Sequence, residues 1–443
     1  MQGLVSKAGA PPLSVEEELF KKLVILITFM PQDGGITPEK PGDFSRVSAF
    51  HMIELQGGKM MKKRLIAALL ATCLAVTACA CSAPNDSSAS AGSGVSAASS
   101  VANHKPIPKD KIKVGFLYVG VIGDEGYSYQ HDQGRKELEK ELGVKTVYLE
   151  NVPETSDCEK SIRDLIDQGC NVIYGTSFGF MQWMDNVAKE YPDVYFGHAT
   201  GYMQEDNMSN YMGRIEEPRY LSGIVAGLKT KVNKIGYVAA MPTAEVIRGC
   251  NAFTLGVRSV NPNATVEVKW TNTWYDPSLE KSAATELLNA GCDVLAQHCD
   301  SSAPQVAAQE RGAFAVGYNA STLSAAPKAY LTAPLFHWGV YYVQDVKDII
   351  AGTWKSQSYW EGMKSGIVSL DKLSGNCPAG AQEKVDAAAK KITDGSFKVF
   401  QGEIKDNTGK VRVPAGSAMS DKDELSCDWF VQGVIGSVPK TSK

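Results

Sequence analysis

The sequence lacks the short motifs by which P-loop NTPases, dinucleotide-binding enzymes and zinc peptidases are recognised. It contains no Walker loop and no H-E-x-x-H, and Gly120, Gly123 and Gly126 do not form G-x-G-x-x-G. Histidine is scarce, with six in 443 residues, and His298 has no histidine or cysteine at a ligand spacing on its own element. These absences argue against catalysis. We therefore predict a protein that is not an enzyme and needs no cofactor and no metal.

The sequence also lacks a strong charge imbalance and an apolar run long enough to cross a membrane. The net charge is −4, which gives no basic surface for nucleic acid. The apolar run from Leu65 to Val76 is well short of the ~20 residues that a spanning helix needs. With 44% hydrophobic residues over this length, however, the chain can bury two cores.

The short apolar run is typical of a secretory signal. Within Met61–Cys81 a basic stretch precedes it and small residues follow it, ending at a cysteine. The residues Val76-Thr-Ala-Cys79 resemble the bacterial lipobox. We therefore predict a lipoprotein signal peptide over 60–78 and a lipid on Cys79, which would anchor the chain to the extracytoplasmic face of the cell membrane.

Two further segments have no predicted chemistry. Residues 1–59 precede the signal, although a signal peptide must be N-terminal, so we interpret them as a spurious or unstructured extension. Residues 79–110 are rich in Ser, Ala and Gly and then in Pro and Lys, which is typical of a flexible tether.

Seven of the ten cysteines fall in the part predicted to fold, so at least one of them is unpaired. Cys377 and Cys427 could form a disulfide that staples the C-terminal stretch of an exported chain. Two buried thiols are the alternative.

The folded part begins with Lys111–Gly134, which combines an apolar strand, a glycine-rich turn and the start of a helix. In open α/β sheets, ligands lie beyond the carboxyl ends of the strands. We therefore expect Asp124, Tyr127, Tyr129, Gln130 and Asp132 to lie where a ligand would be met. A solvated loop is the alternative.

Strand and helix patterns then alternate twice along the chain, which predicts two α/β lobes with doubly wound parallel sheets and a ligand cleft between them. The first lobe is expected over 111–231 and about 336–360, and the second over 232–335 and about 361–443. Strands are predicted at 112–119, 144–149, 171–174, 194–198, 210–213, 235–240, 266–270, 294–298 and 313–317, and helices at 157–168, 181–190, 217–229, 245–260, 277–290 and 302–311.

Aromatic, acidic and amide side chains recur at the predicted strand ends in both halves. Tryptophan seldom occurs in a loop without a surface to cover, so these clusters suggest a binding site. For single residues a structural role is the alternative, and His298 in particular is predicted to be a hydrogen-bonded structural histidine. The clusters contain Ser177 and Phe178; Glu216 and Glu217; Trp270 and Trp274; His298, Asp300 and Ser301; Tyr318 and Asn319; and Phe336, His337 and Trp338.

Several stretches in order resemble the basic membrane protein (BMP) family of substrate-binding lipoproteins of ABC transporters. They are residues 111–134, GTSFGF (175–180), 210–227, 234–262, VKWTNTWYDP (268–277) and HCDSSAP (298–304), and the resemblance covers essentially all of 111–443. It implies the type I periplasmic-binding-protein fold, with three crossovers between the lobes. It also implies a monomer that delivers a small molecule to ABC permease and ATPase subunits.

Characterised members of that family bind purine nucleosides or bases, so the resemblance implies a purine ligand. The base-stacking aromatic falls at Tyr127 or Tyr129, and Asn319 stands where nucleoside binders tend to have aspartate, which favours a free base. A sugar or another small polar solute is the alternative, bound by a transporter subunit or a sensor. The predicted ligand-binding residues are Asp124, Tyr127, Tyr129, Gln130, Ser177, Phe178, Glu216, Trp274, Asp300, Asn319 and Trp338.

Overall fold

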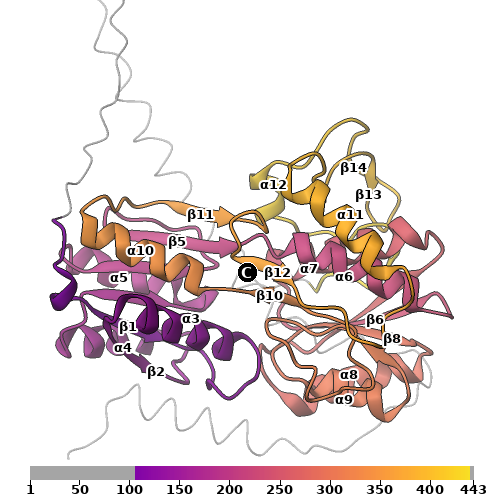
Figure 1. Cartoon of the computed structure of the whole chain (residues 1–443), viewed down its shortest axis with the longest axis horizontal. Coiled ribbons are helices and arrows are strands. Elements are labelled where there is room, and N and C mark those ends of the chain that lie inside the picture. Colours follow the sequence, from indigo (N-terminus) through magenta and orange to yellow (C-terminus); the bar gives the residue numbers. More distant parts are fainter. Residues whose placement is uncertain (1–104, 440–443) are drawn as a thin grey trace, which may run out of the picture. The chain divides into compact units, whose positions relative to one another are not determined.

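The computed structural model describes residues 105–439 (Figure 1). The predictions for 1–59, for the signal peptide at 60–78, for Cys79 and for most of the tether lie outside the described residues. The prediction of α/β architecture with parallel sheets is confirmed, because two separate parallel sheets form. Every element predicted up to residue 317 recurs with bounds shifted by at most two residues: for example, the strand predicted at 112–119 covers Lys113–Leu117, and the strand predicted at 313–317 covers Phe314–Ala315. The helices and strands after residue 317 were not among the predicted elements.

The first lobe is built on a six-stranded sheet in the order β11-β5-β4-β3-β1-β2, in which every neighbouring pair is parallel. Apolar side chains on both faces of the central strands explain why helices cover both faces. Helices α3 and α10 cover one face, and α4 and α5 cover the other. The strands are β1 (Lys113–Leu117), β2 (Lys145–Leu149), β3 (Val172–Gly175), β4 (Tyr195–Ala199), β5 (Met208–Gly213) and β11 (Ser358–Glu361); the helices are η1 (Lys109–Lys111), α3 (Tyr127–Leu142), α4 (Asp157–Asp167), η2 (Phe178–Phe180), α5 (Met181–Glu190) and α10 (Gly339–Ala351).

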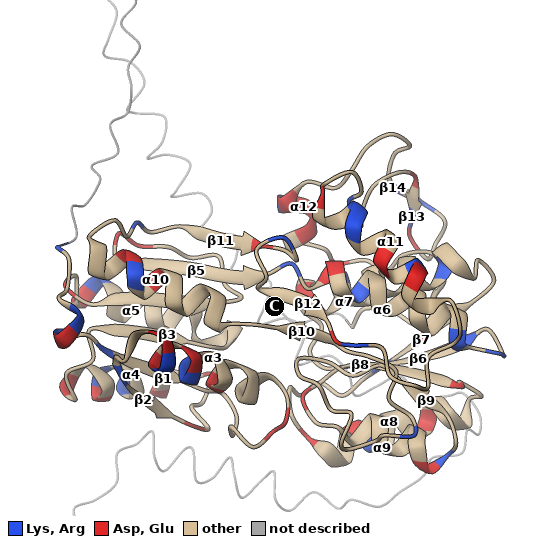
Figure 2. Cartoon of the chain, in the orientation of Figure 1, with Lys and Arg blue, Asp and Glu red and all other residues tan. Residues whose placement is uncertain are grey.

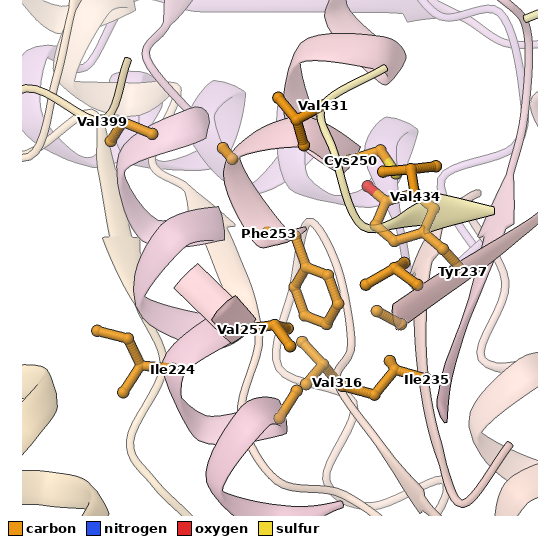
Figure 3. Packing of buried hydrophobic residues seen from close by; sticks show 14 of the residues in the cluster. Ile224, Ile235, Tyr237, Cys250, Phe253, Val257, Val316, Val399, Val431 and Val434 are labelled. Carbon is orange, nitrogen blue, oxygen red and sulfur yellow. The ribbon is translucent and has the colours of Figure 1, made fainter. Parts of the chain in front are cut away.

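The second lobe has a five-stranded parallel sheet in the order β15-β7-β6-β8-β9. Figure 3 shows part of its core, where Phe253 and Val257 of one helix face Ile235 and Tyr237 of the central strand. Helices α6, α7 and α11 contribute to this core, and α8 and α9 cover the other face. The strands are β6 (Lys234–Ala239), β7 (Thr265–Trp270), β8 (Val294–His298), β9 (Phe314–Ala315) and β15 (Val434–Ile435); the helices are α6 (Glu216–Lys229), α7 (Ala244–Val260), α8 (Pro277–Asn289), α9 (Ala303–Glu310), α11 (Ala381–Thr393) and α12 (Asp421–Leu425).

Two small antiparallel pairs complete the structure. β10 (Pro334–Phe336) pairs with β12 (Val368–Leu370), and β13 (Ile404–Lys405) pairs with β14 (Val411–Val413). Acidic and basic residues are interspersed over both lobes (Figure 2), in keeping with the small net charge.

Helix α6 packs in the second lobe, although the expected boundary at residue 231 placed it in the first. Its apolar residues Leu221, Ile224 and Val225 share a core with α7 and β6. The chain therefore first crosses between lobes after β5, near Arg214. It crosses again between β10 and α10 and between β11 and β12. Sequence periodicity locates α6 but does not show which of two neighbouring cores receives it.

The seven cysteines in the described residues are all free, and Cys427 is buried. Cys377 donates from Sγ to the Leu331 carbonyl at 3.2 Å, and Cys427 Sγ lies 3.5 Å from Asn251 Nδ2. Cys377 and Cys427 are therefore two separate thiols and do not form the predicted disulfide.

Candidate ligand-binding site

A cavity of about 390 Å³ lies between the lobes, at the carboxyl ends of strands from both sheets. This is where a ligand is expected in open α/β sheets. The first lobe contributes residues that follow β1, β3 and β4 together with residues of β5 and β11, and the second contributes residues that follow β6, β7 and β8. Five of the predicted ligand-binding residues line this cavity: Tyr127, Ser177, Phe178, Trp274 and Asp300.

Tyr127 and Trp274 bring aromatic rings to the cavity from opposite lobes. The ring of Tyr127 packs against the ring of His131 in an edge-to-face contact, with 4.5 Å between the ring centroids. The Tyr127 hydroxyl is buried and has no hydrogen-bond partner among the described residues. Phe178 and Tyr202 are 40% and 73% exposed, so both keep much of their surface in solvent while contributing to the cavity wall.

Three predicted residues near the start of α3 lie outside the cavity lining. Asp124 accepts hydrogen bonds from the backbone N–H groups of Gly126, Ser128 and Tyr129 at 2.8–2.9 Å, so it shapes the turn. Burial raises the pKa of Asp124 despite these three bonds. Tyr129 is 37% exposed, and Gln130 donates to the Phe336 carbonyl.

The other three predicted residues outside the lining support residues that belong to it. Asn319 donates to Asp300 Oδ1 at 3.0 Å. Glu216 forms an ion pair with Arg248 at 3.3 Å. Trp338 stacks on His131 at 4.3 Å between centroids, and His131 in turn supports Tyr127.

A hydrogen-bonded cluster of Glu245, His298 and Tyr318 belongs to the cavity wall. The Tyr318 hydroxyl donates to Glu245 Oε1 at 3.2 Å and lies 3.0 Å from His298 Nε2. Burial lowers the pKa of His298 to about 4, so this histidine is neutral at pH 7. Burial alone raises the pKa of Glu245, but the bonds to His298 and Tyr318 and the charge of Arg248 lower it overall. The cluster thus holds a carboxylate at the cavity.

Asp300 has a different environment from Glu245. Burial, followed by the negative charge of Asp124, raises its pKa well above the ordinary value. No basic side chain forms an ion pair with Asp300 among residues 105–439. A carboxyl group in this setting can accept one hydrogen bond and, when protonated, donate another.

Arg248 and Trp360 also line the cavity. The Arg248 guanidinium lies 5.1 Å from the Trp360 ring centroid, and Arg214 lies 3.7 Å from the same ring. The ion pair with Glu216 satisfies part of the charge of Arg248, so the arginine is held by protein groups.

Glu245, Arg248 and Trp360 line the cavity but were not predicted as site residues. His298 and Tyr318 also line it, although the sequence placed them only in the strand-end clusters and not among the ligand-binding residues. The strand-end rule points to Glu245 and Arg248, because α7 begins directly after β6. It also points to Trp360, but only once residues 358–361 are recognised as a strand.

Residues 175–179, GTSFG, match G-x-S-x-G, the pattern around a hydrolase nucleophile. The Ser177 hydroxyl, however, donates to Glu154 Oε1, and His198 Nε2 contacts the Ser177 carbonyl and not its hydroxyl. Among the described residues, no histidine is therefore hydrogen-bonded to the Ser177 hydroxyl as a base. Within residues 105–439, no group of three His, Cys, Asp or Glu side chains could hold a metal ion.

Comparison with known proteins identifies similar chains. Residues 111–400 match the family described as "Bmp: ABC transporter substrate-binding protein PnrA-like". The chain is 42% identical over 334 residues to a purine-binding protein of Brucella abortus, covering 75% of this chain and 95% of that one. It is 38% identical over 338 residues to a putative ABC transporter glucose-binding protein of Haloferax volcanii, covering 75% and 83%.

A solved structure of an ABC transporter solute-binding protein from Conexibacter woesei has a similar fold. The TM-score is 0.56 at 21% sequence identity, and the match covers 65% of this chain and 98% of that one. The prediction of a periplasmic-binding-protein fold is confirmed by this similarity together with the two parallel sheets.

Proposed function

Because the chain belongs to the PnrA-like substrate-binding proteins of ABC transporters, we propose that its ligand is a purine base or purine nucleoside bound between the lobes. The observation that carries the proposal is the cavity wall, which combines Tyr127 and Trp274 from opposite lobes with the carboxyl groups of Asp300 and Glu245. A purine needs aromatic contact on its faces and fixed polar groups at its edge. The Brucella abortus relative is named for purine binding, which supports the same ligand class.

The polar groups favour a purine over a ligand with a net charge. Arg248 is already paired with Glu216, and Glu245 is already hydrogen-bonded to Tyr318, so neither group requires a ligand ion. Asp300 with its raised pKa can accept from a ring N–H or exocyclic amine and donate to a ring nitrogen. The edge of a purine presents both kinds of group.

A second candidate is a sugar or another small polar solute on the same fold. It is supported by the Haloferax volcanii relative, which is named as a putative glucose-binding protein. Sugar sites also combine aromatic faces with carboxyl groups, so Trp274 and Asp300 suit this ligand as well.

Calorimetric titration of the purified protein with adenine, guanine, adenosine, guanosine and glucose tests both candidates. We expect heat of binding with at least one purine and none with glucose. Binding of glucose, with no heat and no thermal shift from any purine, would overturn the purine proposal and support the sugar.

As a substrate-binding protein of an ABC transporter, the chain acts outside the cytoplasm and delivers a small molecule to permease and ATPase subunits. None of the helices in residues 105–439 is long and apolar enough to span a bilayer. We propose that Cys79 carries the lipid that holds the protein at the membrane and that the protein acts as a monomer. Cys79→Ser should move it from the detergent phase to the aqueous phase, and an unchanged distribution would exclude this anchor.

A further inference from the structure

The turn before α3 presses against the backbone of the second lobe. A Cβ atom added to Gly126 would overlap the Asp300 carbonyl oxygen and lie 2.8 Å from its carbonyl carbon and 2.9 Å from its Cα. No real side chain tolerates such contacts with backbone atoms, which cannot rotate away. Gly126 therefore allows the two lobes to approach at this point.

A polar contact joins the lobes beside Gly126. Ser302 Oγ donates to Glu125 Oε2 at 3.2 Å. Glu125 has φ 58°, a left-handed conformation that is strained for a residue other than glycine. The turn is held in this form by Asp124, which accepts three backbone hydrogen bonds from the residues that follow.

The residue that Gly126 touches is also part of the cavity wall. The backbone N–H of Asp300 donates to the Trp274 carbonyl at 3.3 Å, and its side chain accepts from Asn319. The backbone of Asp300 thus meets the first lobe while the residue itself lines the cavity with Trp274. A ligand that orders Asp300 would order the contact between the lobes at the same time.

We infer that Gly126 and Asp300 form a closure contact, through which occupation of the cavity stabilises the closed arrangement of the lobes. Gly126 is a positioning residue, because it acts through Asp300 and does not line the cavity itself. The inference rests on the proposed function only for the identity of the ligand. A side chain at 126 would hold the lobes apart whichever solute binds.

Gly123→Ala is a matched control for Gly126→Ala. Both glycines lie in the same turn, but among residues 105–439 no atom beyond the chain neighbours of Gly123 lies within 4 Å of a Cβ built there. Amide hydrogen exchange of the purified protein, measured over 122–128 and 298–303 without ligand and with adenine, reports the contact directly. Calorimetry with adenine reports its effect on affinity.

We expect Gly126→Ala to speed exchange at 298–303, across the lobe boundary, and to weaken adenine binding at least tenfold. Gly123→Ala should match the wild type in both measurements. Ser302→Ala removes only the hydrogen bond to Glu125 and should give smaller changes in exchange and affinity, in the same direction. This variant keeps the test usable if Gly126→Ala folds poorly.

The failure of this inference is distinguishable from the failure of the proposed ligand. If adenine binds no variant but Gly126→Ala still speeds exchange at 298–303, the purine proposal fails and the closure contact stands. If Gly126→Ala and Ser302→Ala both match Gly123→Ala in exchange at 298–303, the closure contact is refuted, whatever the affinity for adenine.

Discussion

At the scale of single residues, two tyrosines that are two positions apart have different surroundings. Tyr127 lines the cavity and its hydroxyl is buried, whereas Tyr129 is 37% exposed and lies outside the lining. Residues two apart on a helix point in directions about 200° apart, so only one of the pair can face the second lobe. The sequence does not show which of the two tyrosines faces the cavity. The direction in which α3 begins places Tyr127 there.

Tyr127→Ala should weaken purine binding by about one to two decades, because stacking of a base on an aromatic ring is worth roughly 1–3 kcal/mol. Tyr129→Ala is the matched control and should leave the dissociation constant unchanged within about threefold. Calorimetry on both variants checks this. Equal losses from the two substitutions would mean that Tyr127 has no special role in stacking.

At the scale of secondary structure, helices α6 and α7 approach so closely that glycine is required at their crossing. A Cβ on Gly256 of α7 would lie 2.8 Å from the Tyr220 carbonyl carbon of α6, and one on Gly223 of α6 would lie 3.0 Å from the Phe253 carbonyl carbon. This close approach explains why α6 belongs to the second lobe. Larger residues at these positions would force the two helices apart.

Gly256→Ala should therefore destabilise the protein by about 1–3 kcal/mol, the usual cost of overpacking. Gly375→Ala should be nearly neutral, since no atom lies within 4 Å of a Cβ built there. Denaturant unfolding of both variants provides the measurement. A Gly256→Ala midpoint equal to that of Gly375→Ala would show that the helices can separate without cost.

Helix α6 also contacts the third crossover through Glu217, which accepts a hydrogen bond from the Met363 N–H at 2.6 Å. Burial raises the pKa of Glu217 from 4.5 to about 7. Between these values the folded protein binds more protons than the unfolded chain does. The contribution of Glu217 to stability is therefore complete below about pH 4.5 and is lost as the pH rises through about 7.

Glu217→Gln keeps an oxygen that can accept from Met363 and removes the ionisation. Relative to wild type, its free energy of unfolding should be similar at pH 4.5 and higher at pH 8 by on the order of 1–3 kcal/mol. Glu383→Gln, at an exposed position of α11, is the control for the same substitution outside a buried contact. A Glu217→Gln advantage that is the same at both pH values would contradict the proposed burial of the charge.

At the scale of the whole described chain, two lobes with separate cores are joined by three crossovers and share one cavity. A ligand that contacts both lobes favours the closed arrangement by its differential affinity for that state. We expect the backbone to bend at the crossovers, which lie near Arg214, between β10 and α10, and between β11 and β12.

Saturating purine should therefore reduce the radius of gyration measured by solution scattering, relative to the same protein without ligand. Closure brings the lobes together around the cavity, so the distance between their centres falls. Trp274→Ala is the control. Loss of this ring from the cavity wall should raise the dissociation constant for purine, so at a purine concentration below that constant the variant should stay open. An unchanged radius with ligand shown by calorimetry to be bound would indicate a preformed, rigid pocket.

Up to residue 317, the sequence by itself determined the order and type of the main elements, because hydrophobic periodicity and glycine-rich turns are local properties. The helices and strands that follow, among them α10 and β11, were not predicted. The strand over Lys113–Leu117 and the helix over Met181–Glu190 lie where the pattern predicts them. Strand ends also pointed to Tyr127, Trp274 and Asp300, which line the cavity, since parallel strands in one sheet share a carboxyl edge.

The tertiary structure alone decided which of the polar residues reach the cavity and which support them. Asp124 and Asn319 look equivalent to Asp300 in the sequence, yet the first holds a turn and the second holds Asp300. That difference depends on side-chain direction and on contacts between residues far apart in the chain. The closure contact at Gly126 also depends on residues far apart in the chain, because its partner, Asp300, lies in the other lobe. No local sequence pattern indicates how closely two lobes approach.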